Sequence, residues 1–163
     1  HLYARRQRQM CIRDSSLIPQ VDEFMPDGYT KEEHKMINET KKILHDNNLK
    51  ISATCVRVPI YYCHSEVISV DFEDKINLND IINVFKSASG IKLIENGLNE
   101  NYPTPSFVQG KDDVYIGRIR KDSSNDKGIS FWIVSDNLRK GAALNAIQIM
   151  DSALKLGKIP KFR

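Results

Sequence analysis

The 163-residue sequence predicts an α+β fold, with a mainly antiparallel sheet and helices on one face of it. Two β-rich segments flank a turn-forming stretch, which is typical of a hairpin, and amphipathic helical segments separate further β-rich segments. The composition, 40% apolar and 28% charged, suits one hydrophobic core. Such a sheet leaves its second face for a partner.

The first predicted elements are a helix and two strands. Residues 31–46 predict a helix, because Thr30 suits an N-cap and Glu33 occupies the capping-box position before side chains at helical spacing. The β-branched run 51–60 predicts a strand. Alternating apolar and polar residues over 66–72 predict a second, half-buried strand.

Further along the chain, residues 78–88 predict a second amphipathic helix, with Asn77 as its N-cap and Gly90 as its stop. Such a helix would lie across the sheet. The strands expected at 114–120 and 129–134 flank the turn formers of SSNDKG and predict a hairpin.

A final helix is predicted over residues 137–156, capped by Asp136 and ended near Gly157. Its apolar residues lie on more than one side. Helices of that kind are usually buried, so we expect this one to be covered.

The first fifteen residues, HLYARRQRQMCIRDS, show no helical or alternating period and resemble translated sequencing-adapter sequence. A true basic tail is the alternative. Their four arginines and one aspartate account for the whole formal charge of +3, so composition gives no support for a nucleic-acid surface. Residues 1–15 are therefore predicted to be a non-native prefix, and Ser16 would mark a truncation.

The cysteines bear on metal binding and thiol state, and the apolar runs bear on membrane insertion. Cys11, Cys55 and Cys63 form no CxxC pair and have no matching histidine spacing for zinc, so we predict reduced thiols and no metal. No apolar run approaches the roughly 20 residues that cross a bilayer. We predict a cytoplasmic protein with no membrane partner.

Four polar residues are candidates for a site. Arg57 and His64 flank a short connection; a guanidinium can bind a carboxylate through two hydrogen bonds, and an imidazole can exchange a proton near neutral pH. Glu32 and Lys35 share one helix face. Each also has a purely structural interpretation, as a surface-paired arginine, a loop histidine and a solvated ion pair.

Cys63 lies beside His64, which suggests a cysteine nucleophile with its base. Neighbouring side chains of an extended chain point to opposite faces, so these two would not easily meet. A buried, inert thiol is the alternative that we favour. A metal site formed by Cys63, His64 and Glu66 would lack a fourth ligand at a recognisable spacing.

Several segments resemble aspartate-semialdehyde dehydrogenases in order and spacing, from about Leu17 to Leu154. They are IPQVDEF, GYTKEEHKMINETKKIL, ATCVRVPIYYCHSE, YPTP, DDVYIGRIR and SDNLRKGAALNAIQI. The resemblance implies a carboxy-terminal domain like that of glyceraldehyde-3-phosphate dehydrogenase. It also implies NADPH-dependent reduction of aspartyl phosphate to aspartate semialdehyde through a cysteine thioester, with release of phosphate, on the route to lysine, threonine and methionine.

The resemblance also implies roles for single residues. His64 matches the family's acid/base histidine and Arg57 the arginine that holds the substrate carboxylate. Glu32 matches the residue that binds the substrate amino group, and Lys35 the one that contacts phosphate. Asn145 would approach the nicotinamide, with helix packing as the alternative. Cys63 stands where many relatives have glycine.

The sequence has no glycine-rich dinucleotide turn and no nucleophilic cysteine in the family's motif. Residues 16–163 are thus predicted to be a substrate-binding and dimerisation domain truncated on its amino-terminal side, in a homodimer or homotetramer. NADP would be bound mostly by the missing domain. Alternatives are an interaction module without catalysis, or a related acyl-phosphate reductase with other residues around Arg57 and Lys35.

The chain by itself is expected neither to bind NADP tightly nor to turn over substrate, because the nucleophile and cofactor site would lie outside it. The purified chain can be assayed for phosphate-dependent oxidation of aspartate semialdehyde. Measurable turnover would contradict the expectation.

Overall fold

The computed structural model describes residues 15–95 and 102–158 and divides the chain into two units, 1–60 and 61–163. Each unit is described by itself. The prefix predicted at residues 1–15 lies outside the described residues except for Ser15. In these described ranges, no helix combines the length and apolar character needed to cross a membrane.

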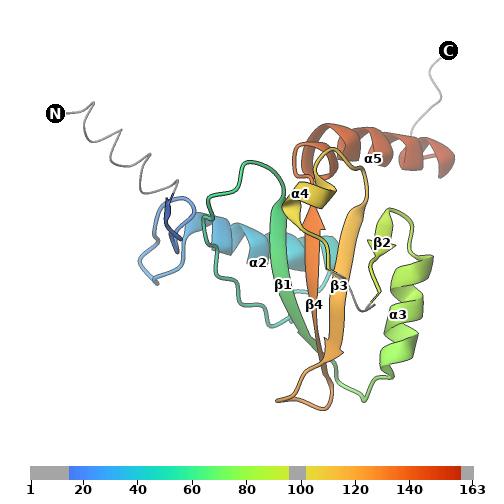
Figure 1. Ribbon diagram of the computed structural model, residues 1–163, viewed down its shortest axis with the longest axis horizontal. Helices are drawn as coiled ribbons and strands as arrows, with labels where there is room; N and C mark the ends of the chain where they lie inside the picture. Colours follow the sequence, from blue (N-terminus) through green and yellow to red (C-terminus); the bar gives the residue numbers. More distant parts are fainter. Residues whose placement is uncertain (1–14, 96–101, 159–163) are drawn as a thin grey trace. The chain divides into compact units, whose positions relative to one another are not determined.

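The first unit contains helix α2, Lys31–Leu44 (Figure 1), as the capping pattern predicted. The side-chain oxygen of Thr30 accepts from the backbone N–H of Glu33, and the Glu33 carboxylate accepts from the backbone N–H of Thr30. The helix ends at His45, which adopts a left-handed conformation with φ of 54°. The predicted helix is confirmed to within two residues.

The strand predicted at 51–60 is wrong. This segment makes a single antiparallel bridge, in which Arg57 exchanges two backbone hydrogen bonds with Ile18, of 2.8 and 3.0 Å. Strand propensity reports how well a side chain fits a half-buried sheet surface, and the described part of the first unit provides no such sheet here. The β-branched residues therefore lie in irregular chain.

The second unit is built on a four-stranded mixed sheet, seen at the centre of Figure 1. Its strands are β1 (His64–Asp71), β2 (Ile91–Leu93), β3 (Val114–Lys121) and β4 (Gly128–Ser135). The order is β1-β4-β3-β2; β4 runs antiparallel to β1 and β3, and β2 runs parallel to β3. The hairpin of β3 and β4 was predicted, whereas β2 was not.

Helix α3 (Leu78–Ser87) packs on one face of this sheet, at the right in Figure 1. Asn77 caps it as predicted, by accepting from the backbone N–H of Asn79. Phe85 of α3 contacts Phe131 of β4, with ring centroids 5.3 Å apart. The main core thus lies between α3 and this face.

A four-residue helix, α4 (Pro105–Val108), contacts the sheet on its other face. Val108 packs against Val134, whose side chain points away from Phe131 because strand residues alternate between faces. The prediction that helices lie on one face only is therefore wrong. A helix this short shows no apolar period, but Thr104 at its N-cap and Pro105 in its first turn do mark its start.

The turn between β3 and β4 requires glycine at position 128. A Cβ atom there would lie 2.9 Å from the Cβ of Asp122 and 2.9 Å from Oδ1 of Asp71. The same Asp71 oxygen accepts a 2.7 Å hydrogen bond from the side-chain amide of Asn125. This contact ties the turn to β1.

The single helix predicted at 137–156 is wrong in two respects. The segment forms a π-helical turn, Arg139–Ala143, followed by α5 (Leu144–Lys155), and they meet at a kink where Ala142 has φ of −139° and ψ of −108°. Nor is α5 buried, since Ile147 is 59% exposed. An all-round apolar pattern predicts burial only where other elements cover the helix, and the described part of the second unit leaves these side chains open.

Candidate functional site

Glu32 and Lys35 lie on one face of α2, as their spacing predicted. Nζ of Lys35 is 3.4 Å from Oε1 of Glu32, and both side chains are partly open to solvent. An exposed pair of this kind contributes about 0–1 kcal/mol to stability. The pair therefore costs little to separate, and both charges are available to a ligand.

Arg57 is held through its backbone by the bridge to Ile18, while its side chain is exposed. Within the described residues, no hydrogen bond or ion pair joins its guanidinium to another side chain. The arginine is thus fixed at its main chain and open at its charged end.

Glu33 joins the two elements that carry these three residues. Its Oε2 accepts a 2.7 Å hydrogen bond from the backbone of Thr30, and its Oε1 accepts one of 2.8 Å from the backbone of Cys55. These two N–H groups hold the pKa of the carboxyl below its usual value. The sequence identified Glu33 only as a helix cap, because its bond to Cys55 spans 22 residues.

His64 belongs to the second unit, where it is the exposed first residue of β1 and pairs with Ser135 of β4. Its neighbour Cys63 has φ of 69° and is only 5% exposed. The Cys63 thiol donates to the carbonyl of Pro105 at 3.5 Å and packs against Val108. The exposed side chain of His64 therefore directly follows a buried residue, Cys63, in the chain.

Burial, with a smaller contribution from Asp136, raises the pKa of the Cys63 thiol. A raised pKa keeps the sulfur protonated, which disfavours nucleophilic attack. This agrees with the inert thiol favoured from the sequence. The left-handed backbone at Cys63 also explains why glycine would suit the same position.

Asp136, which follows β4, is a buried carboxylate that holds two loops together. Its Oδ2 accepts from the backbone N–H of Gly110 at 2.8 Å, and its Oδ1 accepts from that of Leu138 at 3.0 Å. The hydrogen bond from Gly110 is the largest cause that lowers the pKa of Asp136. The sequence predicted Asp136 as a cap, and the bond to Leu138 is of that kind.

Asn145 lies in the first turn of α5, half-buried, directly after the kink. Lys140 crosses the kink and donates a 2.6 Å hydrogen bond to the side chain of Gln148. A π-helical distortion often marks a functional segment. The nicotinamide contact of Asn145 stays a prediction.

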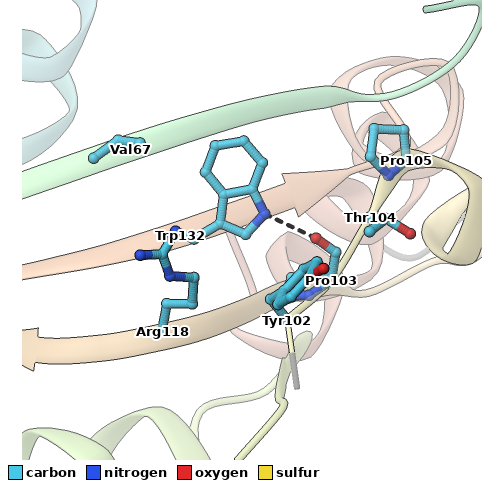
Figure 2. Close-up of a pocket in the computed structure, with 7 residues that line it drawn as sticks. All are labelled: Val67, Tyr102, Pro103, Thr104, Pro105, Arg118 and Trp132. Carbon is cyan, nitrogen blue, oxygen red and sulfur yellow. Dashed lines mark hydrogen bonds between the residues drawn. The ribbon is translucent and has the colours of Figure 1, made fainter. Parts of the chain in front are cut away.

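A hollow of about 310 Å³ lies on the sheet face that carries Trp132 (Figure 2). Its lining residues are Val67, Tyr102, Pro103, Thr104, Pro105, Arg118 and Trp132. The indole N–H of Trp132 donates a 2.8 Å hydrogen bond to the carbonyl of Pro103, which fixes one wall. None of the predicted site residues lines this hollow.

A metal site in a protein needs a cluster of ligating side chains such as His, Cys, Asp and Glu. In residues 15–95 and 102–158, no group of three or more such side chains is placed to hold a metal ion.

Comparison with known proteins gives consistent matches. Residues 10–140 match the family described as semialdehyde dehydrogenase, dimerisation domain. The aspartate-semialdehyde dehydrogenase of Aquifex aeolicus is 51% identical over 142 residues, which are 87% of this chain and 42% of that protein. The chain thus spans about two fifths of the length of such relatives.

Solved structures of aspartate semialdehyde dehydrogenases are also similar to this chain. Aspartate semialdehyde dehydrogenase II from Vibrio cholerae, complexed with ASA, is 42% identical with a TM-score of 0.81, over 86% of this chain and 41% of that one. An aspartate semialdehyde dehydrogenase with NADP from Candida albicans has a TM-score of 0.59 at 24% identity, over 76% of this chain and 40% of that one. The second likeness concerns the fold alone.

Asp136→Asn is expected to lower the free energy of unfolding at neutral pH by about 1–3 kcal/mol, because an amide cannot accept from both N–H groups as the carboxylate does. The pKa of Asp136 is lowered in the folded state, so its stabilisation is present above about pH 4 and is lost as the pH falls further. The variant should therefore lose less stability on acidification.

Urea denaturation of the purified chain between pH 3 and 7 measures both effects. Asp126→Asn, which changes an exposed aspartate, is the matched control and should behave like the parent chain. Equal stability and equal acid sensitivity of the parent and Asp136→Asn would contradict the role given to Asp136.

Proposed function

The chain belongs to the semialdehyde dehydrogenase family, and on that premise we propose that it forms the substrate-binding and dimerisation part of an aspartate-semialdehyde dehydrogenase. The proposed reaction is NADPH-dependent reductive dephosphorylation of aspartyl phosphate to aspartate semialdehyde through a cysteine thioester, in the biosynthesis of lysine, threonine and methionine. The activity belongs to the longer polypeptide that the relatives represent. For residues 16–163 we propose a substrate-binding and dimerisation domain like the carboxy-terminal domain of glyceraldehyde-3-phosphate dehydrogenase.

The observation that carries this proposal is the arrangement in the first unit. Arg57 lies on a segment that Glu33 joins to α2, which presents Glu32 and Lys35. Aspartyl phosphate has a carboxylate, an ammonium group and a phosphate, whose charges complement a guanidinium, a carboxylate and an ammonium group in that order. One small unit thus provides a charge partner for each polar end of the substrate.

His64 is the proposed acid/base residue. Its ring is exposed at the start of β1, where the pairing with Ser135 and the buried Cys63 fix its backbone. Imidazole exchanges protons near neutral pH, so it can deprotonate a thiol and protonate a leaving oxygen within one cycle. The nucleophilic thiol itself is proposed to lie in polypeptide outside this chain, because the sequence has no cysteine in the family's nucleophile motif and Cys63 is buried.

NADP is the proposed cofactor, bound mostly outside this chain, and its reduced form, NADPH, would supply the hydride. Asn145 is the residue of this chain proposed to approach the nicotinamide. Its place beside the kink at Ala142 supports this role, because irregular backbone in a helix frees polar groups that a ligand can use.

Substitution of Arg57 or His64 tests the site in a full-length enzyme that contains this chain. Arg57→Lys should raise the KM for aspartate semialdehyde about tenfold, because lysine cannot form the two-pronged bond to the carboxylate. His64→Asn should lower kcat about 100-fold or more, because asparagine cannot transfer a proton near neutral pH. Steady-state kinetics measures both, and unchanged constants for both variants would defeat the assignment.

A second role, self-association, is favoured by the family description and by the open sheet face. Val67, 65% exposed, lies beside its strand partner Trp132 on the face that carries the hollow. A second copy of the chain would cover this apolar surface. We therefore propose that this face forms the interface between copies of the chain, in a homodimer or a homotetramer.

Analytical ultracentrifugation of the chain tests this role. Val67→Glu should convert dimer to monomer, because it places a charge in the proposed interface. Val84→Glu is the matched control, since Val84 is 60% exposed on α3 and lies outside that face. Dissociation by both variants, or by neither, would refute the location of the interface.

A further inference from the structure

Glu33 carries more hydrogen bonds than a helix cap requires. The carboxylate is almost fully buried, with the residue only 6% exposed, and a buried charge is costly unless hydrogen bonds compensate it. One oxygen completes the capping box with Thr30, which is a local contact. The other oxygen bonds the backbone of Cys55, so the same side chain also fixes a distant segment.

The segment that carries Arg57 is also restrained at other points in the first unit. Its irregular chain is held by the bridge between Arg57 and Ile18, and by a 3.4 Å contact from the Cys55 sulfur to the sulfur of Met36 on α2. Cys55 and Arg57 are two residues apart, a span of at most about 7 Å. A shift of the Cys55 backbone would therefore move Arg57.

We infer that Glu33 is a positioning residue, which sets the distance between Arg57 and the pair Glu32 and Lys35 by bonding Cys55 to the start of α2. This inference rests on the proposed function, because it makes Glu33 part of the structure that positions Arg57 for binding the substrate carboxylate. Glu33 does not touch substrate in this account. It acts by holding the guanidinium at the right place before substrate arrives.

The chemistry of the contact requires a carboxylate. Both partners of Glu33 are backbone N–H donors, and an ionised carboxylate can accept from both at once. Glutamine would present one acceptor oxygen and one NH2 group, and the NH2 group would face a second donor. The lowered pKa of Glu33 keeps its carboxyl ionised at neutral pH.

Glu33→Gln in a full-length enzyme that contains this chain is the direct test. It should raise the KM for aspartate semialdehyde roughly tenfold while kcat stays near that of the parent, because loss of one hydrogen bond to a charged group misplaces Arg57. Cys55→Pro removes the N–H donor from the other side of the same contact and should raise KM in the same way.

Thr30→Ala is the matched control. It removes the hydroxyl that accepts from the backbone of Glu33, yet both Glu33 oxygens keep their partners. The variant should lower the melting temperature, as cap removal does, without raising KM. A rise in KM equal to that of Glu33→Gln would show that Glu33 acts only through helix stability and would overturn the inference.

A double-mutant cycle with Arg57→Lys separates this inference from the proposed function. If Glu33 acts through Arg57, then Glu33→Gln should add little to the KM of the Arg57→Lys enzyme. Additive effects of the two substitutions on KM would overturn the inference and leave the proposed function standing. So would a normal KM for both Glu33→Gln and Cys55→Pro if the KM of Arg57→Lys is raised. A normal KM for Arg57→Lys would instead defeat the proposed function.

Discussion

Strand β4 is the element on which the second unit depends. It pairs antiparallel with β1 on one side and with β3 on the other, and its side chains contribute to the packing on both faces of the sheet. Phe131 packs under α3, whereas Val134 packs with Val108 of α4. The strand also starts at Gly128, where the turn leaves no room for a side chain, and its end places Asp136 in the buried interior. The position of His64 follows from this strand, because Ser135 is its partner.

Two buried carboxylates perform the same physical task in the two units. Glu33 joins α2 to the segment of Arg57, and Asp136 joins the loop at Gly110 to the start of the π-helical turn. In each case the acceptor satisfies backbone N–H groups that would otherwise be unpaired in irregular chain. These irregular segments are thereby held without regular secondary structure. The side chains of Arg57 and His64 are both exposed.

The sequence predicted the elements whose signals are local. The caps Thr30 and Asn77 locate α2 and α3, and the turn formers locate the hairpin, because each signal acts within a few residues. The pair Glu32 and Lys35 was predictable for the same reason.

Features that depend on distant parts of the chain were missed. The run 51–60 has strand propensity but no sheet to join in the described first unit, and the apolar pattern of α5 gives no sign of whether another element covers it. The link from Glu33 to Cys55 and the packing of α4 on the second face likewise arise only from the fold. The roles proposed for Arg57 and His64 come from the resemblance of the whole sequence to the family, because spacing alone left them ambiguous.

The central proposal is that the first unit binds the substrate through Arg57, Glu32 and Lys35. A crystal structure of a full-length enzyme containing this chain, with aspartate semialdehyde bound, tests it most directly. We expect the substrate carboxylate to accept two hydrogen bonds from the Arg57 guanidinium and the substrate ammonium group to lie at Glu32. Substrate bound away from both Arg57 and Glu32 would contradict the proposal.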